Sequence, residues 1–292
     1  MSDVVDESLQ LAGLDPVEVR RLVALALDED LRFGPDVTTE STIRVDQAAR
    51  AQVAAREAGV VCGGLVALAV LEAVGFPLSG VEVDVADGGS VQPGEVVMSL
   101  EGPLRALLVA ERTSLNFMTH LSGVASATYA WSRALEGTNC RVRDTRKTTP
   151  GLRQLEKYAV RCGGGINHRM GLGDAALIKD NHVAATGSIT AAIDDVRRRY
   201  PAIALEVECD TLEQVKEALS TGCSLILLDN MSVSEIGQAV ALARAFPDVR
   251  LEASGGLTLS SAGDVAATGV DFVSVGALTH SVRALDLGLD LL

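Results

Sequence analysis

The chain has 292 residues, of which 48% are hydrophobic and 22% are charged, and its formal net charge is −14. These values are typical of a globular protein with one large domain or two, and they argue against a disordered chain. The acidic total argues against nucleic-acid binding. No apolar run reaches the roughly 18 residues of a membrane span, so we expect the chain to bind neither nucleic acid nor a membrane.

Cysteine usage and the N-terminus bear on the cellular compartment. The five cysteines are an odd number and form no C-x-x-C pair, so the sequence predicts neither a disulfide framework nor a zinc site. The first ten residues, MSDVVDESLQ, are acidic and lack an apolar segment, so we expect no signal peptide. We therefore expect free thiols, mostly buried, in a reducing cytoplasm.

The first elements in chain order are a helix and a loop. Residues 16–28 are predicted to be helical, because Pro16 suits a first turn and apolar residues follow along one side. The next segment, DEDLRFGPDVTTEST, is rich in turn residues. Its acidic residues are candidate metal ligands, but they lack EF-hand spacing, so a solvated loop is favoured. These residues are Asp28, Glu29, Asp30 and Asp36.

Short strands and a long helix come next. Residues 49–57 and 81–85 are predicted strands, and DGGSVQPGEVVMSLEG, residues 87–102, has two glycine-containing turns. The last segment resembles the hammerhead fold of biotinyl and lipoyl carriers, but it lacks their modified lysine, so we expect a structural β module. Residues 104–135 are predicted to be mostly helical, with a break at Ser122-Gly123. On that helix, Arg112 lies beside the apolar stripe, which is usual for a surface arginine.

From residue 140 onward, short apolar runs alternate with stretches of helical length. Repeated βα units of this kind predict a parallel sheet, and short apolar runs are typical of strands covered on both faces. Six such runs predict an open sheet or a barrel with fewer strands than the usual eight. The predicted strands are residues 140–146, 175–178, 203–208, 224–228, 250–253 and 271–275, and predicted helices include residues 188–199, 211–220 and 232–245.

A basic segment stands out in this acidic chain. Residues 141–179 hold nine basic and three acidic side chains, a local balance of +6. Three of the basic residues, Arg153, Lys157 and Arg161, are spaced four apart and are explained by a solvated helix face. Four of the other six fall at the ends of apolar runs or beside glycines, which indicates a pocket for a small, highly charged anion. These are Arg146, Lys147, Arg169 and Lys179, with His168 as a further candidate contact.

The ends of the six predicted strands are polar or rich in glycine. In a barrel, such ends build the active site, and the loops after the last strands often hold a phosphate. The glycines there suit backbone N–H groups that approach phosphate oxygens. Carboxylates among the cations suggest Mg²⁺ or a developing positive charge. The carboxylates are Glu208 and Asp229, and the glycine-rich turns contain Ser254, Gly255, Gly256 and Gly276.

At this point a family resemblance is evident. DTRKTTPGLRQLEKYAVRCGGGINHRMGLGDAALIKDNH, residues 144–182, resembles the core signature of the quinolinate phosphoribosyltransferases. ERTSLNFMTHLSGVAS, EVECD, LLDNM, EASGG and VSVGALTHS resemble the family's other blocks, in the family's order. The long block is highly specific, whereas SGG alone is not. The loop GPDVTTEST departs from the pattern by a proline, which leaves Asp36 without a role.

The resemblance implies a fold, a reaction and an assembly. The fold is α/β: an N-terminal α/β sandwich over residues 1–115, joined by the tail 282–292, and then an incomplete, TIM-like α/β barrel over residues 116–281. The reaction transfers phosphoribose from phosphoribosyl pyrophosphate to quinolinate with decarboxylation, in NAD biosynthesis. The products are nicotinate mononucleotide, pyrophosphate and CO₂, and the cofactor is Mg²⁺. The assembly is a homodimer or a higher homo-oligomer.

The resemblance also implies roles for the residues. Guanidinium groups match carboxylates bidentately, so arginines are expected to hold the two carboxylates of quinolinate. The implied quinolinate contacts are Arg146, His168, Arg169 and, from the neighbouring subunit, Arg112. Lys147 and Lys179 are implied to contact pyrophosphate or a carboxylate, and Glu208 and Asp229 the ribose and Mg²⁺; these four are the expected catalytic residues. Ser254, Gly255, Gly256, Gly276 and His280 are implied to hold the 5′-phosphate.

Three other functions remain open on the sequence. A Schiff-base phosphosugar aldolase would use Lys179 beside the same phosphate site, although the paired arginines argue against it. A related phosphoribosyltransferase acting on another base fits the same motifs. A non-catalytic anion- or RNA-binding module is poorly served, because only Tyr158 offers an aromatic ring within the basic segment.

Overall fold

The structure is a computed structural model, and it describes residues 3–292. The chain forms two compact units. The first comprises Met1–Tyr129, Thr149–Gly164 and Ser281–Leu292, and the second comprises Ala130–Thr148 and Gly165–His280. The boundary predicted between residues 115 and 116 falls within a helix and stays a prediction.

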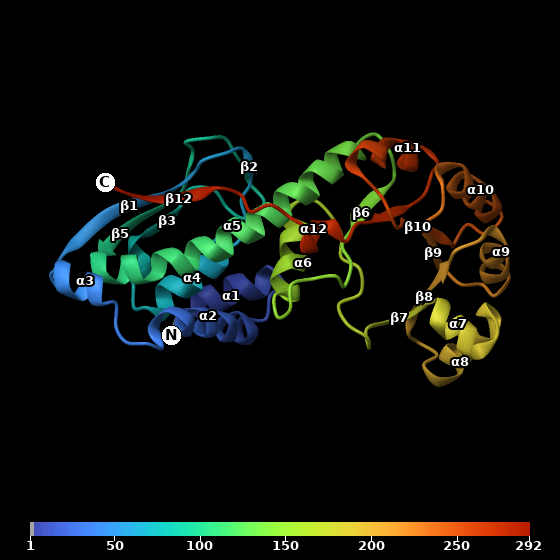
Figure 1. The fold of residues 1–292 in the computed structure, drawn as a ribbon, viewed down its shortest axis with the longest axis horizontal. Helices are drawn as coiled ribbons and strands as arrows, with labels where there is room; N and C mark the ends of the chain where they lie inside the picture. Colours follow the sequence, from blue (N-terminus) through green and yellow to red (C-terminus); the bar gives the residue numbers. More distant parts are fainter. Residues whose placement is uncertain (1–2) are drawn as a thin grey trace. The chain divides into compact units, whose positions relative to one another are not determined.

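The first unit contains an antiparallel sheet of four strands (Figure 1). Its order is β12 (Leu287–Leu291), β1 (Ala48–Ala55), β5 (Val96–Pro103) and β3 (Val81–Val83), so the end of the chain pairs with the first strand. Apolar side chains of β1 and β5 join α4 (Gly64–Ala73) and α5 (Leu104–Ala134) in one core. Residues 87–102 form the predicted β module, with β4 (Ser90–Val91) paired to β2 (Gly59–Val60) and leading to β5.

The segment at residues 28–42 is largely helical, which corrects the predicted loop. Helix α2 runs over Pro16–Leu31, past its predicted end, and the guanidinium of Arg32 pairs with Asp28 one turn earlier. Helix α3 follows at Val37–Thr42, and the carboxylate of Asp36 accepts a hydrogen bond from the Thr39 N–H at 3.0 Å. Asp36 therefore caps a helix, a role its side chain suits well. Helix α1 (Asp3–Leu11) precedes them.

The predicted break in the long helix is wrong, because α5 is continuous through Ser122 and Gly123. The buried hydroxyl of Ser122 bonds the backbone N–H and C=O of Cys62, at 2.9 and 3.1 Å. At Gly123, a Cβ atom would lie 2.3 Å from the carbonyl oxygen of Arg283. Both residues thus let the helix pack closely on distant segments, which their sequence neighbours do not reveal.

The solvated helix face predicted for α6 (Arg153–Cys162) is wrong for Lys157. Arg161 is exposed and donates to the carbonyl of Ala12, but the side chain of Lys157 is fully buried, as is that of Glu156. A carboxylate oxygen of Glu156 lies 2.8 Å from His120 Nε2, and the other accepts the Thr149 N–H at 3.0 Å. Glu156 therefore ties α6 to α5 and to the segment before α6.

The second unit is a parallel α/β sheet of six strands, and each lies within one residue of its predicted range or inside it. The first and last strands in the spatial order are edges, so the sheet is not closed, which agrees with the predicted incomplete barrel. Helices follow most of the strands and pack on them (Figure 1). The order is β6 (Arg141–Arg143), β11 (Phe272–Ser274), β10 (Arg250–Ser254), β9 (Leu225–Asp229), β8 (Ala204–Cys209) and β7 (Ala175–Ile178).

Several helices of this unit begin with a capping side chain. Thr211 caps α9 (Leu212–Ser220) and Ser232 caps α10 (Val233–Ala243), each in a capping box. The other helices are α7 (Asp180–Thr186), α8 (Ile189–Arg199), α11 (Ala262–Ala267) and α12 (Ala277–His280). Within residues 3–292, no helix has both the length and the hydropathy that a membrane crossing requires.

Candidate active site

Two adjoining cavities lie at the carboxyl ends of the six strands. The first, of about 360 Å³, is lined mostly by charged side chains, and the second, of about 180 Å³, mostly by glycines and small residues. Both are lined by Thr145, Lys147, Ser254 and Ser274. The first cavity also has Arg146, His168, Arg169, Lys179, Glu208 and Asp229, and the second has Gly255, Gly256, Gly276 and His280.

Arg146 and Arg169 bring two guanidinium groups to the first cavity. Nε of Arg146 is buried and has no hydrogen-bond partner within the described part of the chain. Arg169 is held by a hydrogen bond from Nη1 to the carbonyl of Ala175, at 3.1 Å. Burial, and then the positive charge of Arg146, lowers the pKa of Arg169. Two such cations facing one cavity favour a ligand with more than one negative charge.

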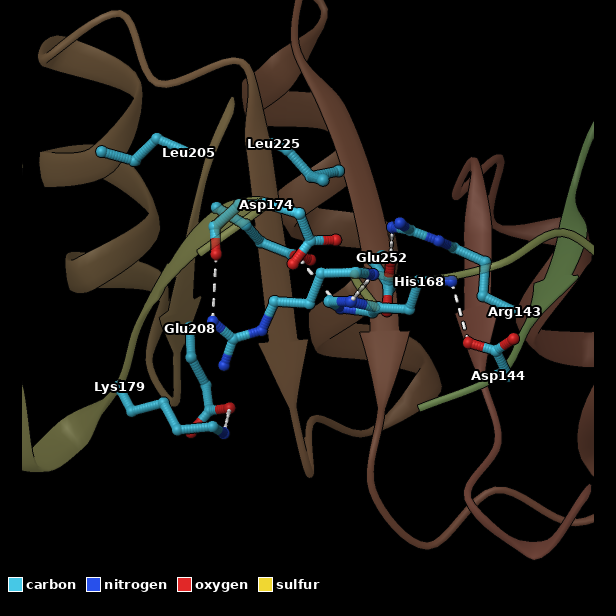
Figure 2. A network of polar contacts seen from close by, with 12 residues as sticks. Arg143, Asp144, His168, Asp174, Lys179, Leu205, Glu208, Leu225 and Glu252 are labelled. Atoms are coloured by element: carbon cyan, nitrogen blue, oxygen red, sulfur yellow. Dashed lines mark hydrogen bonds and ion pairs between the residues drawn. The ribbon is translucent and has the colours of Figure 1, made fainter. Parts of the chain in front are cut away.

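Acidic side chains share the first cavity with these cations. Lys179, at the end of β7, forms an ion pair with Glu208, near the end of β8 (Figure 2). Asp229 ends β9, and its Oδ2 accepts a hydrogen bond from the side chain of Asn230 at 2.7 Å. The cavity therefore presents both signs of charge, as the sequence predicted.

Backbone geometry shapes the second cavity. Gly255 and Gly256 have φ of +85° and +62°, values that residues with a side chain rarely adopt. A Cβ atom on Gly276 would lie 2.9 Å from the Lys147 side chain and 3.0 Å from His280 Nε2, so glycine permits that close approach. The Thr279 hydroxyl donates a hydrogen bond to the Lys147 carbonyl at 2.7 Å. Such a glycine-rich turn is suited to an anion that approaches the backbone.

Under the first cavity lies a buried polar network around His168 (Figure 2). Its Nε2 is 3.0 Å from Glu206 Oε2 and 3.7 Å from Glu252 Oε1, and Glu252 also pairs with Arg143. Burial, and then the charge of Glu206, raises the pKa of Glu252. The backbone N–H of His168 donates to Asp144 Oδ1 at 2.9 Å. The network connects β6, β8 and β10 beneath the predicted site.

Comparisons with known proteins identify the family of this chain. Residues 36–122 match the model of the quinolinate phosphoribosyl transferase N-terminal domain, and residues 124–290 match that of its C-terminal domain. A nicotinate-nucleotide pyrophosphorylase [carboxylating] of Mycobacterium leprae is 51% identical over 276 residues, which cover 93% of this chain and 96% of the relative. The chain belongs to the quinolinate phosphoribosyltransferase family.

Other members of the family are similar over nearly their whole length. The probable nicotinate-nucleotide pyrophosphorylase of Bacillus subtilis is 40% identical over 282 residues, 95% of this chain and 94% of the relative. The solved structure of the nicotinate-nucleotide pyrophosphorylase from Francisella tularensis superposes with a TM-score of 0.86 at 37% identity, covering 94% and 96% of the two chains. The predicted family and fold are thus confirmed, and the chain is a phosphoribosyltransferase.

Most residues that the family resemblance implied line these two cavities, and Arg112 does not. Arg112 lies on α5 in the first unit, and its side chain is exposed. Within residues 3–292, no hydrogen bond or ion pair of its guanidinium is found. Both cavities are lined by residues of the second unit alone.

Sequence reasoning missed the buried network of this family member. Side chains two apart on a strand point to the same face, so Glu206 could have been found from Glu208, and Glu252 from Ser254. Asp144 could have been found from Arg146 in the same way, but the partners of Arg143 and Asp144 could not. They act through contacts with segments about 25 to 110 residues away, such as Arg143 with Glu252 and Asp144 with His168.

Glu208 and Asp229 fit a magnesium ion that binds together with the phosphates of a substrate. Mg²⁺ prefers oxygen ligands and is usually held by one or two carboxylates together with substrate phosphates and water. Both carboxylates line the charged cavity, next to the glycine-lined one. In the described residues, the one group of three side chains spaced for a caged ion is His168, Glu206 and Glu252, in the buried network. The donor set therefore suits a metal bound with the substrate.

Proposed function

We propose that the chain transfers phosphoribose from phosphoribosyl pyrophosphate to the ring nitrogen of quinolinate, with loss of one carboxylate as CO₂. The products are nicotinate mononucleotide and pyrophosphate, a step of NAD biosynthesis. The observation that carries this proposal is the pair of guanidiniums, Arg146 and Arg169, in a cavity that also contains two carboxylates and adjoins a glycine-lined anion site. Relatives of the chain are named nicotinate-nucleotide pyrophosphorylase [carboxylating] and quinolinate phosphoribosyltransferase [decarboxylating], and these names support the same reaction.

Quinolinate binding is assigned to the guanidinium side of the first cavity. Its two adjacent carboxylates offer four acceptor oxygens, and guanidiniums bind such groups bidentately. Arg146 and Arg169 hold these carboxylates and so fix the ring in one orientation. Lys147, on the wall between the two cavities, and Lys179 add point charges toward a carboxylate or the pyrophosphate. The ring nitrogen is thereby aimed at the anomeric carbon of the ribose.

The donor substrate is assigned to the other side of the site. Ser254, Gly255, Gly256, Gly276 and His280 hold its 5′-phosphate in the second cavity, as backbone N–H groups in glycine-rich turns do. Glu208 and Asp229 hold the ribose hydroxyls, and their negative charge stabilises the positive charge that develops at the anomeric carbon as pyrophosphate leaves. Glu208 and Asp229 would hold Mg²⁺, which would supply positive charge to neutralise the pyrophosphate.

Decarboxylation follows from the charge that the transfer creates. Once the ring nitrogen is bonded to the ribose it is cationic, and it stabilises the electron pair left on the adjacent carbon when CO₂ departs. That carbon then takes a proton, which completes nicotinate mononucleotide. The side chains need only hold the ring while the bond breaks.

The decisive experiment supplies quinolinate, phosphoribosyl pyrophosphate and Mg²⁺ and follows nicotinate mononucleotide and CO₂ by mass spectrometry. Nicotinate is the matched control, because it lacks one carboxylate. Leaving buried charges unpaired costs several kcal/mol, so we expect discrimination of about 10⁴-fold in kcat/KM. Comparable turnover of nicotinate would reassign the chain to another base. Removing Mg²⁺ with a chelator should abolish turnover, and adding Mg²⁺ back should restore it.

We further propose a cytoplasmic homodimer or higher oligomer in which Arg112 completes the quinolinate site of a neighbouring subunit. The exposed guanidinium of Arg112 has no partner of its own in the described chain. The two carboxylates of quinolinate can also accept more hydrogen bonds than two bidentate guanidinium forks donate. The five free thiols suit a reducing compartment.

Complementation tests this assembly. Arg112→Ala and Lys147→Ala should each lower activity by more than about 30-fold, since breaking a buried charge pair costs about 2–5 kcal/mol. When the two variants are refolded together, mixed dimers contain one site with neither lesion if Arg112 acts on the neighbour, so partial activity returns. If Arg112 acts within its own subunit, every site keeps a lesion and the mixture stays inactive. Native mass spectrometry confirms that mixed dimers formed.

A further inference from the structure

Both ring nitrogens of His168 are engaged by the chain itself. Nδ1 lies 2.7 Å from the backbone nitrogen of Arg169, whose N–H donates to it. Nε2 lies 3.0 Å from Glu206 Oε2. A nitrogen that accepts a hydrogen bond has no proton, so the ring proton lies on Nε2 and is donated to Glu206. The geometry thus selects one neutral tautomer of His168.

Glu206, and not Glu252, is the acceptor for this histidine. Glu252 Oε1 is 3.7 Å from Nε2, which is beyond a hydrogen bond, and its other oxygen is paired with Arg143. The Glu206 side chain is 5% exposed and that of His168 is 6% exposed. A carboxylate that is buried this deeply needs a specific partner to offset its desolvation, and His168 is such a partner.

The tautomer of His168 matters because the same ring also contacts the backbone of Arg169. Arg169 is fixed at two points: its backbone N–H donates to His168 Nδ1, and its guanidinium Nη1 donates to the carbonyl of Ala175. The opposite tautomer of His168 would place a proton on Nδ1 and set it against the Arg169 N–H. The peptide that leads to this substrate-facing arginine would then lose its anchor. An acidic side chain that orients a histidine by its far nitrogen is a known way of fixing a tautomer.

We propose that Glu206 is a positioning residue for quinolinate: it holds His168 as the Nε2–H tautomer, and His168 in turn holds the Arg169 backbone under the pocket. This inference rests on the proposed function of Arg169. It gives His168 a different part from that implied by the family resemblance, because its ring nitrogens face Glu206 and Arg169. The chain from Glu206 to Arg169 then sets affinity for quinolinate and leaves the phosphoribosyl end of the site unchanged.

The first experiment compares Glu206→Gln with Glu206→Met. The two side chains have nearly the same length, but glutamine keeps an oxygen that accepts from His168 and methionine does not. We expect Glu206→Met to raise the KM for quinolinate about 10-fold or more, the equivalent of about 1.4 kcal/mol, with the KM for phosphoribosyl pyrophosphate unchanged. Glu206→Gln should stay within about threefold of the parent enzyme for both substrates. Glu213→Gln, an exposed glutamate of the same unit, is the neutral control.

The outcomes separate positioning from charge. Glu206 also lies near enough to Arg169 for its charge to raise the pKa of that guanidinium. If charge alone mattered, the two substitutions would act equally, and that result would overturn the proposal. So would a parallel rise in KM for both substrates. If the unmodified protein does not use quinolinate at all, it is the proposed function that fails.

The second experiment reads the tautomer directly in the unmodified protein and does not depend on activity. Long-range ¹H–¹⁵N spectra of the histidine-labelled full chain distinguish a protonated from an unprotonated ring nitrogen. His168→Gln assigns the signal among the four histidines. We expect Nε2 protonated and Nδ1 unprotonated at neutral pH. A protonated Nδ1, a doubly protonated ring, or a stoichiometric metal ion on Nε2, detected by elemental analysis, would overturn the inference.

Discussion

The two cavities of the candidate active site present different groups to a ligand. The first is lined by charged side chains such as Arg146 and Arg169. In the second, Gly255, Gly256 and Gly276 leave space for a ligand to approach the backbone. Contacts from side chains can be removed one at a time by substitution. Contacts from the backbone are lost only when a substitution adds atoms that block the approach of the ligand.

The largest effect is expected at the side-chain end. Arg169→Ala should lower kcat/KM for quinolinate by about 10²–10³-fold, because loss of one partner of a buried charge pair costs about 2–5 kcal/mol. Arg169→Lys should recover part of the loss, since an ammonium keeps the charge without the bidentate fork. Steady-state kinetics with each substrate varied in turn provides the test. An equal effect on the KM for phosphoribosyl pyrophosphate would show that the two ends are not independent.

The carboxylates that lie between the two ends should affect the rate more than binding. Glu208→Gln and Asp229→Asn keep the size of the side chains but remove the charge that stabilises the transition state. We expect kcat to fall by about 10²-fold, the loss typical of one stabilising group, with the quinolinate Kd from calorimetry almost unchanged. The Glu208 variant also frees Lys179 from its ion pair, so its quinolinate Kd is the more sensitive control. Abolished quinolinate binding with turnover preserved would contradict the assignment.

At the backbone end, one added methyl group should matter more at Gly255 than at Gly256. A Cβ atom on Gly255 would lie 2.2 Å from Asn230 Oδ1, whereas a Cβ atom on Gly256 meets nothing within 4 Å. Both glycines have positive φ, so both alanine variants share a backbone cost of roughly 1–2 kcal/mol, and only Gly255→Ala adds the clash. Because Asn230 holds the Asp229 carboxylate, we expect Gly255→Ala to raise the KM for phosphoribosyl pyrophosphate at least about tenfold more than Gly256→Ala does. Equal values for the two variants would rule out the clash as the cause.

The sequence predicted the sheet and much of the site for one physical reason. Parallel strands have a short apolar signal, and their carboxyl ends meet at one edge, so residues as distant as Arg146 and Asp229 had to lie close together. Family motifs then separated the charged end from the glycine-rich end. The meeting of strand ends does not account for Arg112, because Arg112 belongs to a helix of the other unit. Its role stays a prediction.

What the sequence did not reveal depends on tertiary partners. Ser122 and Gly123 look like a helix break, but their neighbours in space, Cys62 and Arg283, are 60 and 160 residues away. The burial of Lys157 is hidden in the same way, because it shares its spacing of four with Arg153 and Arg161, which are less buried. Propensity and periodicity report local preference, and packing against distant segments overrides them.

The smallest effect is expected from a charge outside both cavities. Asp36 caps α3, so Asp36→Ala should lower stability by about 1 kcal/mol and leave the kinetics of both substrates unchanged. A side-chain hydrogen bond and then a backbone hydrogen bond from Thr39 lower the pKa of Asp36 below 3.8. A carboxylate with a lowered folded-state pKa stabilises the fold above its unfolded-state pKa, and this contribution is lost as the pH falls through the folded-state value. The difference in Tm between the parent protein and Asp36→Ala should therefore be constant near neutral pH and shrink below about pH 4.

Asp36→Asn is the matched control, because asparagine caps a helix nearly as well but does not titrate. Calorimetry across this pH range decides the point: a constant difference in acid, or any change in kcat/KM at neutral pH, would mean that Asp36 does more than cap its helix.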